Sequence, residues 1–251
     1  MNKITASKVM KTLEIIFPKK IAEEWDKIGL QVGQKNKVIK KIMISLDLTT
    51  DVFEQAVEKQ VDMIIVHHPF LFNEDDFGKN PKSEWKSKLI ERMNNLGMVL
   101  YVMHTNFDNE PKGMSLAVAN KLELFEKKNI KGLSYGFSVN WNNSISKFIE
   151  ILNKNGIDVE GINVNKRKKV NRIAILPGSG SSLDVQKASK ESDLVITSDV
   201  KWSEWIEHKE NKVNVIEVSH SIEEAFVNHL YLLLLKTMEQ LQIIKYENKN
   251  N

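Results

Sequence analysis

Hydrophobic and polar positions follow two periods along this chain, one typical of helices and one of buried strands. Residues 5–16 place Val9, Leu13 and Ile16 at helical spacing, and Pro18 ends that predicted helix. Short apolar runs bounded by polar residues predict strands, at 41–47, 62–66, 98–103, 172–176, 193–197 and 213–218, with weaker candidates at 135–139 and 243–246. Further helical patterns cover residues 51–60, 84–95, 114–122, 144–154, a segment ending at 190, and about 220–238. This alternation predicts an α/β fold with largely parallel strands.

The alternation weakens over residues 124–170, which are rich in Lys and Asn, and resumes after them. We therefore expect two α/β lobes, residues 1–125 and residues 126–251. The KRKK run at 166–169 is interpreted as a solvated loop rather than a nucleic-acid patch.

Composition narrows the chemistry that these lobes can carry. The chain has 251 residues and a formal net charge of only +3, and arginine occurs only at Arg92, Arg167 and Arg172. Nucleic acid is therefore not an expected partner, because few side chains can clamp phosphates or guanines. There are no cysteines, so any metal ion must be held by nitrogen and oxygen ligands.

Targeting signals are not evident in the sequence. The first 20 residues carry charges through their apolar positions, which is unlike a secretion signal, and the longest apolar runs are too short to span a bilayer. We expect a cytoplasmic protein of bacterial type, with no membrane partner.

Histidines follow two successive predicted strands in the first lobe. His67 and His68 come directly after residues 62–66, and His104 comes directly after residues 98–103, four residues before Asp108. Ligand sites in open α/β sheets gather beyond the carboxyl ends of strands. Adjacent side chains of an extended segment point to opposite sides, so the two histidines could serve different ions. Asp108 could bridge two ions through its two carboxylate oxygens, and His104 could be a ligand or could support one. The alternative is that the histidines lie on the surface and that Asp108 is an ordinary loop residue.

The second lobe repeats the pattern once. His220 follows the predicted strand 213–218 and begins a predicted helix. Glu224 lies four residues after His220 and therefore shares a face of that helix with it. Glu223, three residues on, is the competing carboxylate. Four of the six histidines thus follow predicted strands, whereas His208 and His229 lie within predicted helices. Imidazole and carboxylate ligands suit zinc, iron, manganese or cobalt, and paired ions activate water for hydrolysis.

Three other features have weaker interpretations. The segment Gly178–Ser182 opens a helix and could bind an anion or form a plain turn with a serine cap. Asp26 is interpreted as a structural or rim residue. Trp25 and Trp202 could line a cleft, but packing in the core is favoured.

Taken in order, these motifs resemble the GTP cyclohydrolase 1 type 2 homologue family, also called the NGG-interacting-factor or "Nif-three" family. The matching segments are EWDKIGLQVG at 24–33, SLD at 45–47, IIVHHPFLF at 64–72, HTNFD at 104–108, GSGSS at 178–182, ITSDVKW at 196–202 and VSHSIEEAF at 218–226. They extend over nearly the whole chain, and their order and spacing make the match specific.

The resemblance implies a two-lobed fold with a dinuclear site of divalent metal ions in the cleft between the lobes. Its motif positions assign the ligands to His67, His68, Asp108, His220 and Glu224, and thus favour Glu224 over Glu223. His104 would lie beside the site, where it and Glu224 are candidates for proton transfer. The resemblance also implies a homo-oligomer, a toroidal hexamer, and a short form without the inserted middle domain of some members.

Departures from the family pattern concern the substrate side. Lys27 stands where the family usually has Asn, Ser203 where it has His, Ser198 where it has Gly, and Ser219 where it has Gly. None of them changes a predicted ligand.

Two functions of different class follow from the resemblance. One is a metal-dependent hydrolase that opens the purine ring of GTP to give dihydroneopterin triphosphate, or acts on another nucleotide or small molecule. The other is a non-enzymatic metal-binding regulatory or interaction protein that forms a ring assembly.

Overall fold

The structure, a computed structural model, describes residues 3–72 and 83–248, and these form two compact units. The first unit comprises Met1–Phe107 and Phe226–Asn251, and the second comprises Asp108–Ala225. Their boundaries do not coincide with the predicted division at residue 125. The reason is that the last strand of the chain pairs with an early one, which returns the C-terminal segment to the first unit.

The first unit is built on a five-stranded mixed sheet with the order β1-β4-β3-β2-β10. Its strands are β1 (Gly29–Val32), β2 (Lys41–Ser45), β3 (Met63–Val66), β4 (Val99–Val102) and β10 (Gln242–Lys245). Strands β10, β2, β3 and β4 are parallel, and β1 is added antiparallel at the edge beside β4. Every residue of β3 and β4 is buried, as expected of parallel strands covered on both faces.

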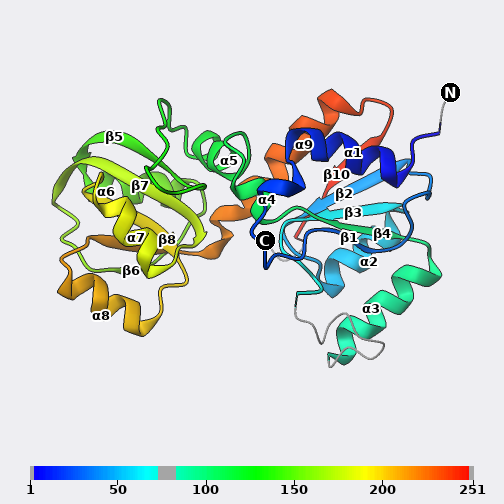
Figure 1. Ribbon diagram of the computed structural model, residues 1–251, viewed down its shortest axis with the longest axis horizontal. Helices are drawn as coiled ribbons and strands as arrows, with labels where there is room; N and C mark the ends of the chain where they lie inside the picture. Colours follow the sequence, from blue (N-terminus) through cyan, green and yellow to red (C-terminus); the bar gives the residue numbers. More distant parts are fainter. Residues whose placement is uncertain (1–2, 73–82, 249–251) are drawn as a thin grey trace. The chain divides into compact units, whose positions relative to one another are not determined.

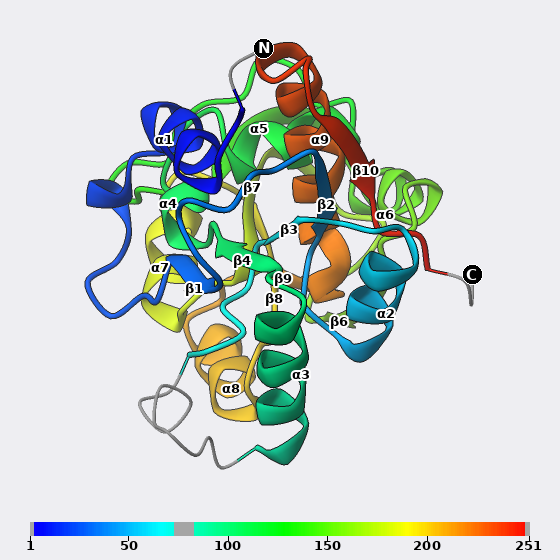
Figure 2. The ribbon, with the colours of Figure 1, turned by 90° about the vertical axis from the view of Figure 1, so that its right-hand side faces the viewer.

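Helices cover both faces of this sheet. They are α1 (Ala6–Ile16), α2 (Thr50–Glu58), α3 (Glu84–Asn95), α9 (Ala225–Thr237) and the short α4 (Thr105–Asp108), with a 3-10 turn at Lys19–Ile21. Figures 1 and 2 place α1 and α9 on one face and α2 and α3 on the other. Phe53 of α2 and Met93 of α3 are fully buried in a cluster with Ile64 and Leu100 of the sheet. Successive side chains of a strand point to opposite faces, so each strand contributes to the packing on both sides of the sheet.

The second unit has its own five-stranded mixed sheet, with the order β5-β7-β8-β9-β6. Its strands are β5 (Phe137–Ser144), β6 (Val159–Ile162), β7 (Lys169–Ser179), β8 (Leu194–Ser198) and β9 (Val215–Val218). The three central strands are parallel, and β5 and β6 are antiparallel edge strands. The helices are α5 (Met114–Lys121), α6 (Ile145–Lys154), α7 (Ser182–Ser189) and α8 (Trp202–Glu210), followed by a 3-10 helix at His220–Glu224. The prediction of an α/β fold with mixed, largely parallel sheets is confirmed.

Two antiparallel edge strands, β1 and β6, were not predicted. Both are four residues long and contain a glycine, so neither has the continuous apolar pattern of a buried strand. The predicted helix over 220–238 is divided, because its first five residues form a 3-10 helix and the α-helix begins at Ala225. Among the described residues, none of the helices has the length and apolar character needed to cross a bilayer.

Candidate metal centre

The carboxyl ends of three neighbouring parallel strands bring polar side chains together in the first unit. Ser45 of β2 pairs with Val66 of β3, and Val66 pairs with Val102 of β4, so the three strands end level. The polar residues that follow at this edge are Asp47, His67, His68 and His104. The expected convergence of histidines after strands β3 and β4 is therefore present within this unit.

The imidazoles of His67 and His68 are each held through the Nδ1 atom. Nδ1 of His67, a fully buried residue, lies 2.8 Å from the carbonyl oxygen of Met103. Nδ1 of His68 lies 2.9 Å from Oδ1 of Asp47. An oxygen acceptor at Nδ1 keeps the ring proton on that atom and leaves the Nε2 lone pair for a ligand.

His104 is held in the same way by a different acceptor. Its Nδ1 lies 3.0 Å from Oδ1 of Asp26, a side chain with no exposed surface. The ring centroid of His104 lies 5.1 Å from that of His67 and 5.7 Å from that of His68. One ring nitrogen of each of the three lies within 4.8 Å of the others, close enough to hold a metal ion. Because each Nδ1 has an oxygen acceptor, Nε2 is the ring nitrogen that would hold such an ion.

The second unit presents an aspartate and a histidine after adjacent parallel strands. Asp199 follows β8 and His220 follows β9, and these two strands pair in parallel register. Nδ1 of His220 lies 2.5 Å from Oδ2 of Asp199. The arrangement repeats that of Asp47 and His68 in the first unit, since an aspartate after one strand anchors the histidine after the next.

Glu223, rather than Glu224, lies beside His220. Oε2 of Glu223 is 2.8 Å from Nε2 of His220, and the residue is 4% exposed, whereas Glu224 is exposed. The spacing argument for Glu224 assumed an α-helix, in which residues four apart share a face, and the choice over Glu223 came from the family motif. The 3-10 helix His220–Glu224 has three residues per turn and aligns residues three apart. Glu224 instead interacts electrostatically with Lys121. Burial lowers the pKa of Lys121, and the charge of Glu224 offsets part of that shift.

Room for the Glu223 carboxylate comes from a glycine at the end of β7. A Cβ atom built on Gly178 would overlap Oε1 of Glu223 and lie 3.0 Å from its carboxyl carbon. Gly178 also has a φ of +73°, which L side chains rarely adopt. The glycine is thus required by the close approach of the carboxylate.

A second carboxylate lies close to Glu223 in this unit. One oxygen of Asp108, the last residue of α4, is within 4.8 Å of an oxygen of Glu223. Two carboxylates at this separation repel each other unless a positive charge lies between or beside them. Without a metal ion that charge comes from His220. The hydrogen bond that the His220 ring donates to Glu223, opposed by burial, and the pairing of the ring with Asp199 raise the pKa of His220 to about 9.

The segment Gly178–Ser182 forms a capped turn. Gly180 N donates to Oγ1 of Thr197, 2.9 Å away, and that hydroxyl donates to the carbonyl oxygen of Gly178. The Ser181 side chain accepts from Asp184 N and caps helix α7. These contacts favour the turn with a serine cap over the anion site.

The two tryptophans that were expected in the core are exposed. Trp25 is 54% exposed and Trp202 is 81% exposed. The Trp25 ring lies edge-on to His104, with 6.0 Å between centroids. The preference for core packing was therefore wrong for both residues.

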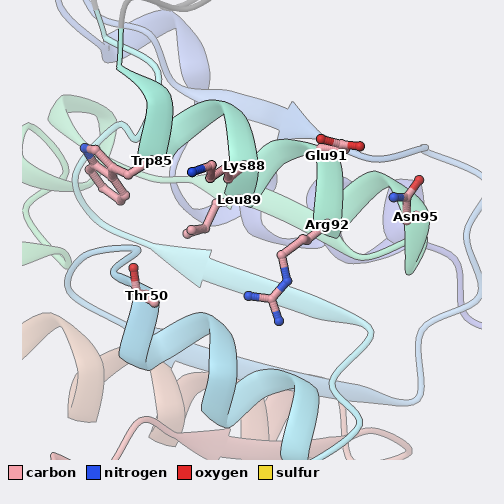
Figure 3. A pocket seen from close by; sticks show the side chains of 7 residues that line it. All are labelled: Thr50, Trp85, Lys88, Leu89, Glu91, Arg92 and Asn95. Atoms are coloured by element: carbon pink, nitrogen blue, oxygen red, sulfur yellow. The ribbon is translucent and has the colours of Figure 1, made fainter.

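A separate cavity of 410 Å³ opens between the start of α2 and one side of α3 (Figure 3). It is lined by Thr50, Trp85, Lys88, Leu89, Glu91, Arg92 and Asn95. None of the predicted ligands lines it. The Arg92 guanidinium is already paired with Glu54 and lies over the Phe53 ring, so it is not available as an anion clamp.

Sequence reasoning missed the residues that orient the histidines. Asp47 and Asp199 end the segments SLD and ITSD, and Asp26 belongs to the WD pair, which was assigned a structural or rim role. A signal for the first two was present, because each follows a strand adjacent to that of its histidine. Pairing of neighbouring strands, however, is a tertiary property.

Comparison with known proteins gives one family. The model of Duf34/NIF3 (NGG1p interacting factor 3) matches residues 4–251. The chain is 33% identical over 238 residues to a "GTP cyclohydrolase 1 type 2 homolog" of Mycoplasmopsis pulmonis, covering 91% of this chain and 92% of that protein. It is 27% identical over 256 residues to "NIF3-like protein 1" of Drosophila melanogaster, covering 96% of this chain and 86% of that protein.

Solved structures share the fold. A hypothetical protein of Staphylococcus aureus has a TM-score of 0.87 at 22% identity, covering 99% of this chain and 97% of that one. Reduced HcgD from Methanocaldococcus jannaschii has a TM-score of 0.79 at 25% identity, covering 99% of this chain and all of that one.

Replacing Gly178 by alanine is expected to displace Glu223 and lower the pKa of His220 from about 9 toward its ordinary value of 6.5. The raised pKa means that His220 contributes stability in full below about pH 6.5, and that this is lost as pH rises through 9. An NMR titration of the His220 ring without metal measures the shift. Gly156→Ala is the control, because Gly156 has a φ of +69° and no atom within 4 Å of a built Cβ. An unchanged pKa in Gly178→Ala would contradict the role of the glycine.

Proposed function

This chain belongs to the Duf34/NIF3 family, and on that premise we propose that it binds two divalent metal ions and acts as a metal-dependent hydrolase. The observation that carries the proposal is the common anchoring of four imidazoles. His67, His68, His104 and His220 each have Nδ1 against an oxygen acceptor. Histidines that bind metals usually donate their other ring nitrogen to such a partner, which fixes the ring orientation.

We assign the metal ligands to His67, His68, Asp108 and His220 with one glutamate. For the glutamate we take Glu223, which contacts the His220 ring, in place of Glu224, which the family motif favours. The donors divide between the compact units, with imidazoles in the first and one imidazole and two carboxylates in the second. Their union in one dinuclear centre is part of the proposal and rests on the family resemblance.

These donors suit zinc, iron, manganese or cobalt, because the ligands are imidazoles and carboxylates without thiolates. Such an ion pair, when bound, supplies positive charge to a substrate oxygen and lowers the pKa of water. The chain's own residues would orient the ions and accept protons. His104, anchored by Asp26, and Glu224, which lies beside Lys121, are the candidates for proton transfer.

GTP is the first substrate to examine, because several relatives carry the name GTP cyclohydrolase 1 type 2 homolog. Opening of the purine ring is a hydrolysis that suits paired ions. The absence of the family's usual histidine at Ser203 bears on substrate handling rather than on the ligands. Location in the cytoplasm is part of the same proposal.

A second candidate function is a metal-binding interaction protein that acts through a ring assembly of its own copies. It is favoured by exposed apolar side chains on α7 and α8, namely Leu183 at 61%, Trp202 at 81% and Ile206 at 50%. Surface apolar groups of this size often mark an interface between proteins. A homo-hexamer is compatible with either function.

Elemental analysis of the purified protein tests the metal centre. We expect about two divalent ions per chain in the wild type and about one or fewer in His68→Ala, since removing one imidazole opens a site. Less than one ion per chain in the wild type would refute the dinuclear centre.

The carboxylate assignment is tested with a matched pair of variants. Glu223→Gln is expected to weaken metal binding by more than about tenfold, while Glu224→Gln leaves it within about twofold. The reverse result would assign the ligand to Glu224 and leave the metal centre standing.

Metal-loaded protein incubated with GTP is expected to form a fluorescent pterin product, and His68→Ala is expected to form less than about a hundredth of it. Product analysis by chromatography makes the comparison. Absence of the pterin from protein that carries its metal would exclude GTP as substrate without affecting the metal centre.

Light scattering tests the assembly. The wild type is expected to have the mass of a hexamer, and Trp202→Asp to dissociate it, because a charge replaces an exposed apolar ring. Ile15→Asp is the control, since Ile15 of α1 is also 81% exposed. A monomeric wild type, or dissociation by the control alone, would contradict this interface.

A further inference from the structure

Four hydrogen-bonding groups surround the buried carboxylate of Asp26. Its Oδ1 lies 2.7 Å from Lys27 N and 3.0 Å from His104 Nδ1, and its Oδ2 accepts from the N–H of Thr105 at 2.9 Å. Oδ2 also accepts from the Thr105 hydroxyl. Asp26 has no exposed side-chain surface. The two N–H groups and the hydroxyl donate to Asp26, so the site is built for an ionised carboxylate.

The Thr105 hydroxyl links Asp26 to a backbone donor. Glu23 N donates to Oγ1 of Thr105 at 3.0 Å, so the hydroxyl hydrogen is directed to Asp26. Burial alone would raise the pKa of Asp26, but the hydrogen bonds from His104 and from Thr105 outweigh it and hold the pKa below its usual range. The carboxylate therefore stays charged and can only accept from His104.

We propose that Asp26 is a positioning residue that holds His104 in its Nδ1–H tautomer, with the Nε2 lone pair facing the ring nitrogens of His67 and His68. This inference rests on the proposed metal centre and gives His104 a defined part in it. In this tautomer Nε2 would be the atom of His104 able to accept a proton at that centre. The structural or rim role expected for Asp26 is thereby replaced by one that acts through His104.

Geometry limits the alternatives for the His104 ring. The ring is partly buried, with 18% of the side chain exposed. Trp25 lies edge-on to it at 6.0 Å, and His67 and His68 lie within 6 Å between centroids. Rotation of the ring by half a turn would place carbon against the Asp26 carboxylate and lose a charge-assisted hydrogen bond.

The test is Asp26→Asn, an isosteric change that replaces one carboxylate oxygen, an acceptor, by an amino group, a donor. The asparagine oxygen is expected to stay with Thr105, whose N–H and hydroxyl both donate to it at the start of α4. Its amino group then takes the Oδ1 position, beside Lys27 N and His104 Nδ1. The amino group can only donate, so Nδ1 must accept and the proton must move to Nε2.

Long-range ¹H–¹⁵N spectra of the imidazoles, recorded without metal over a range of pH, identify which nitrogen carries the proton once the ring is neutral. In the wild type His104 is expected to show a protonated Nδ1 and an unprotonated Nε2, and in Asp26→Asn the reverse. Assignment of its signals uses a His104→Gln variant. A wild-type His104 with its proton on Nε2, or an unchanged tautomer in Asp26→Asn, would overturn the inference.

Asp62→Asn is the matched control for loss of a structural carboxylate. Asp62 also accepts backbone hydrogen bonds in the first unit, from Lys40 N at 2.7 Å and Lys41 N at 3.0 Å, and neither of these partners is a histidine. It is expected to leave the His104 tautomer unchanged, and a change there would indicate a general structural effect. Zinc content of the Asp26→Asn protein is measured in parallel. Failure of the wild type to bind zinc would refute the proposed centre, whereas the tautomer result would still decide the role of Asp26.

Discussion

The constraint on which the candidate site depends is the level ending of neighbouring parallel strands. Strands β2, β3 and β4 pair in parallel without a shift, so the residues just beyond their carboxyl ends emerge at one edge. Strands β8 and β9 do the same in the second unit. A partly buried imidazole is held in place by a partner for Nδ1, and in both units an aspartate beyond the adjacent strand supplies it, as Asp47 does for His68 and Asp199 does for His220.

Anchoring of Nδ1 has a second consequence, because it decides which ring atom remains for chemistry. The acceptors differ among the histidines, a backbone carbonyl for His67 and carboxylates for the other three, yet Nδ1 is the anchored atom in each ring. Carboxylate partners also raise the basicity of the ring and favour metal binding. The carboxylates of Asp26, Asp47 and Asp199 also bring negative charge beside these rings, which favours a bound cation.

Close packing decides how the carboxylates of the second unit are arranged. Glu223 reaches His220 because a 3-10 helix replaces the first turn of α9 and because Gly178 has no side chain in its way. Neither condition concerns the chemistry of Glu223 itself. The same glycine loop that suggested an anion site instead serves to accommodate an anionic side chain of the chain's own, with Thr197 closing its backbone hydrogen bonds.

The order of residues by itself determined the α/β class, the positions of most strands and helices, and the histidines that matter, because hydrophobic periodicity and strand-end polar residues are local properties. It also contained the motifs by which the family is identified. Tertiary structure decided that the C-terminal segment returns to the first unit, because β10 completes a sheet begun two hundred residues earlier. It likewise decided between Glu223 and Glu224 as the contact of His220, and it gave Asp26, Asp47 and Asp199 their partners. Strand register, helix type and the space beside a glycine arise from contacts between distant residues, which no local pattern records.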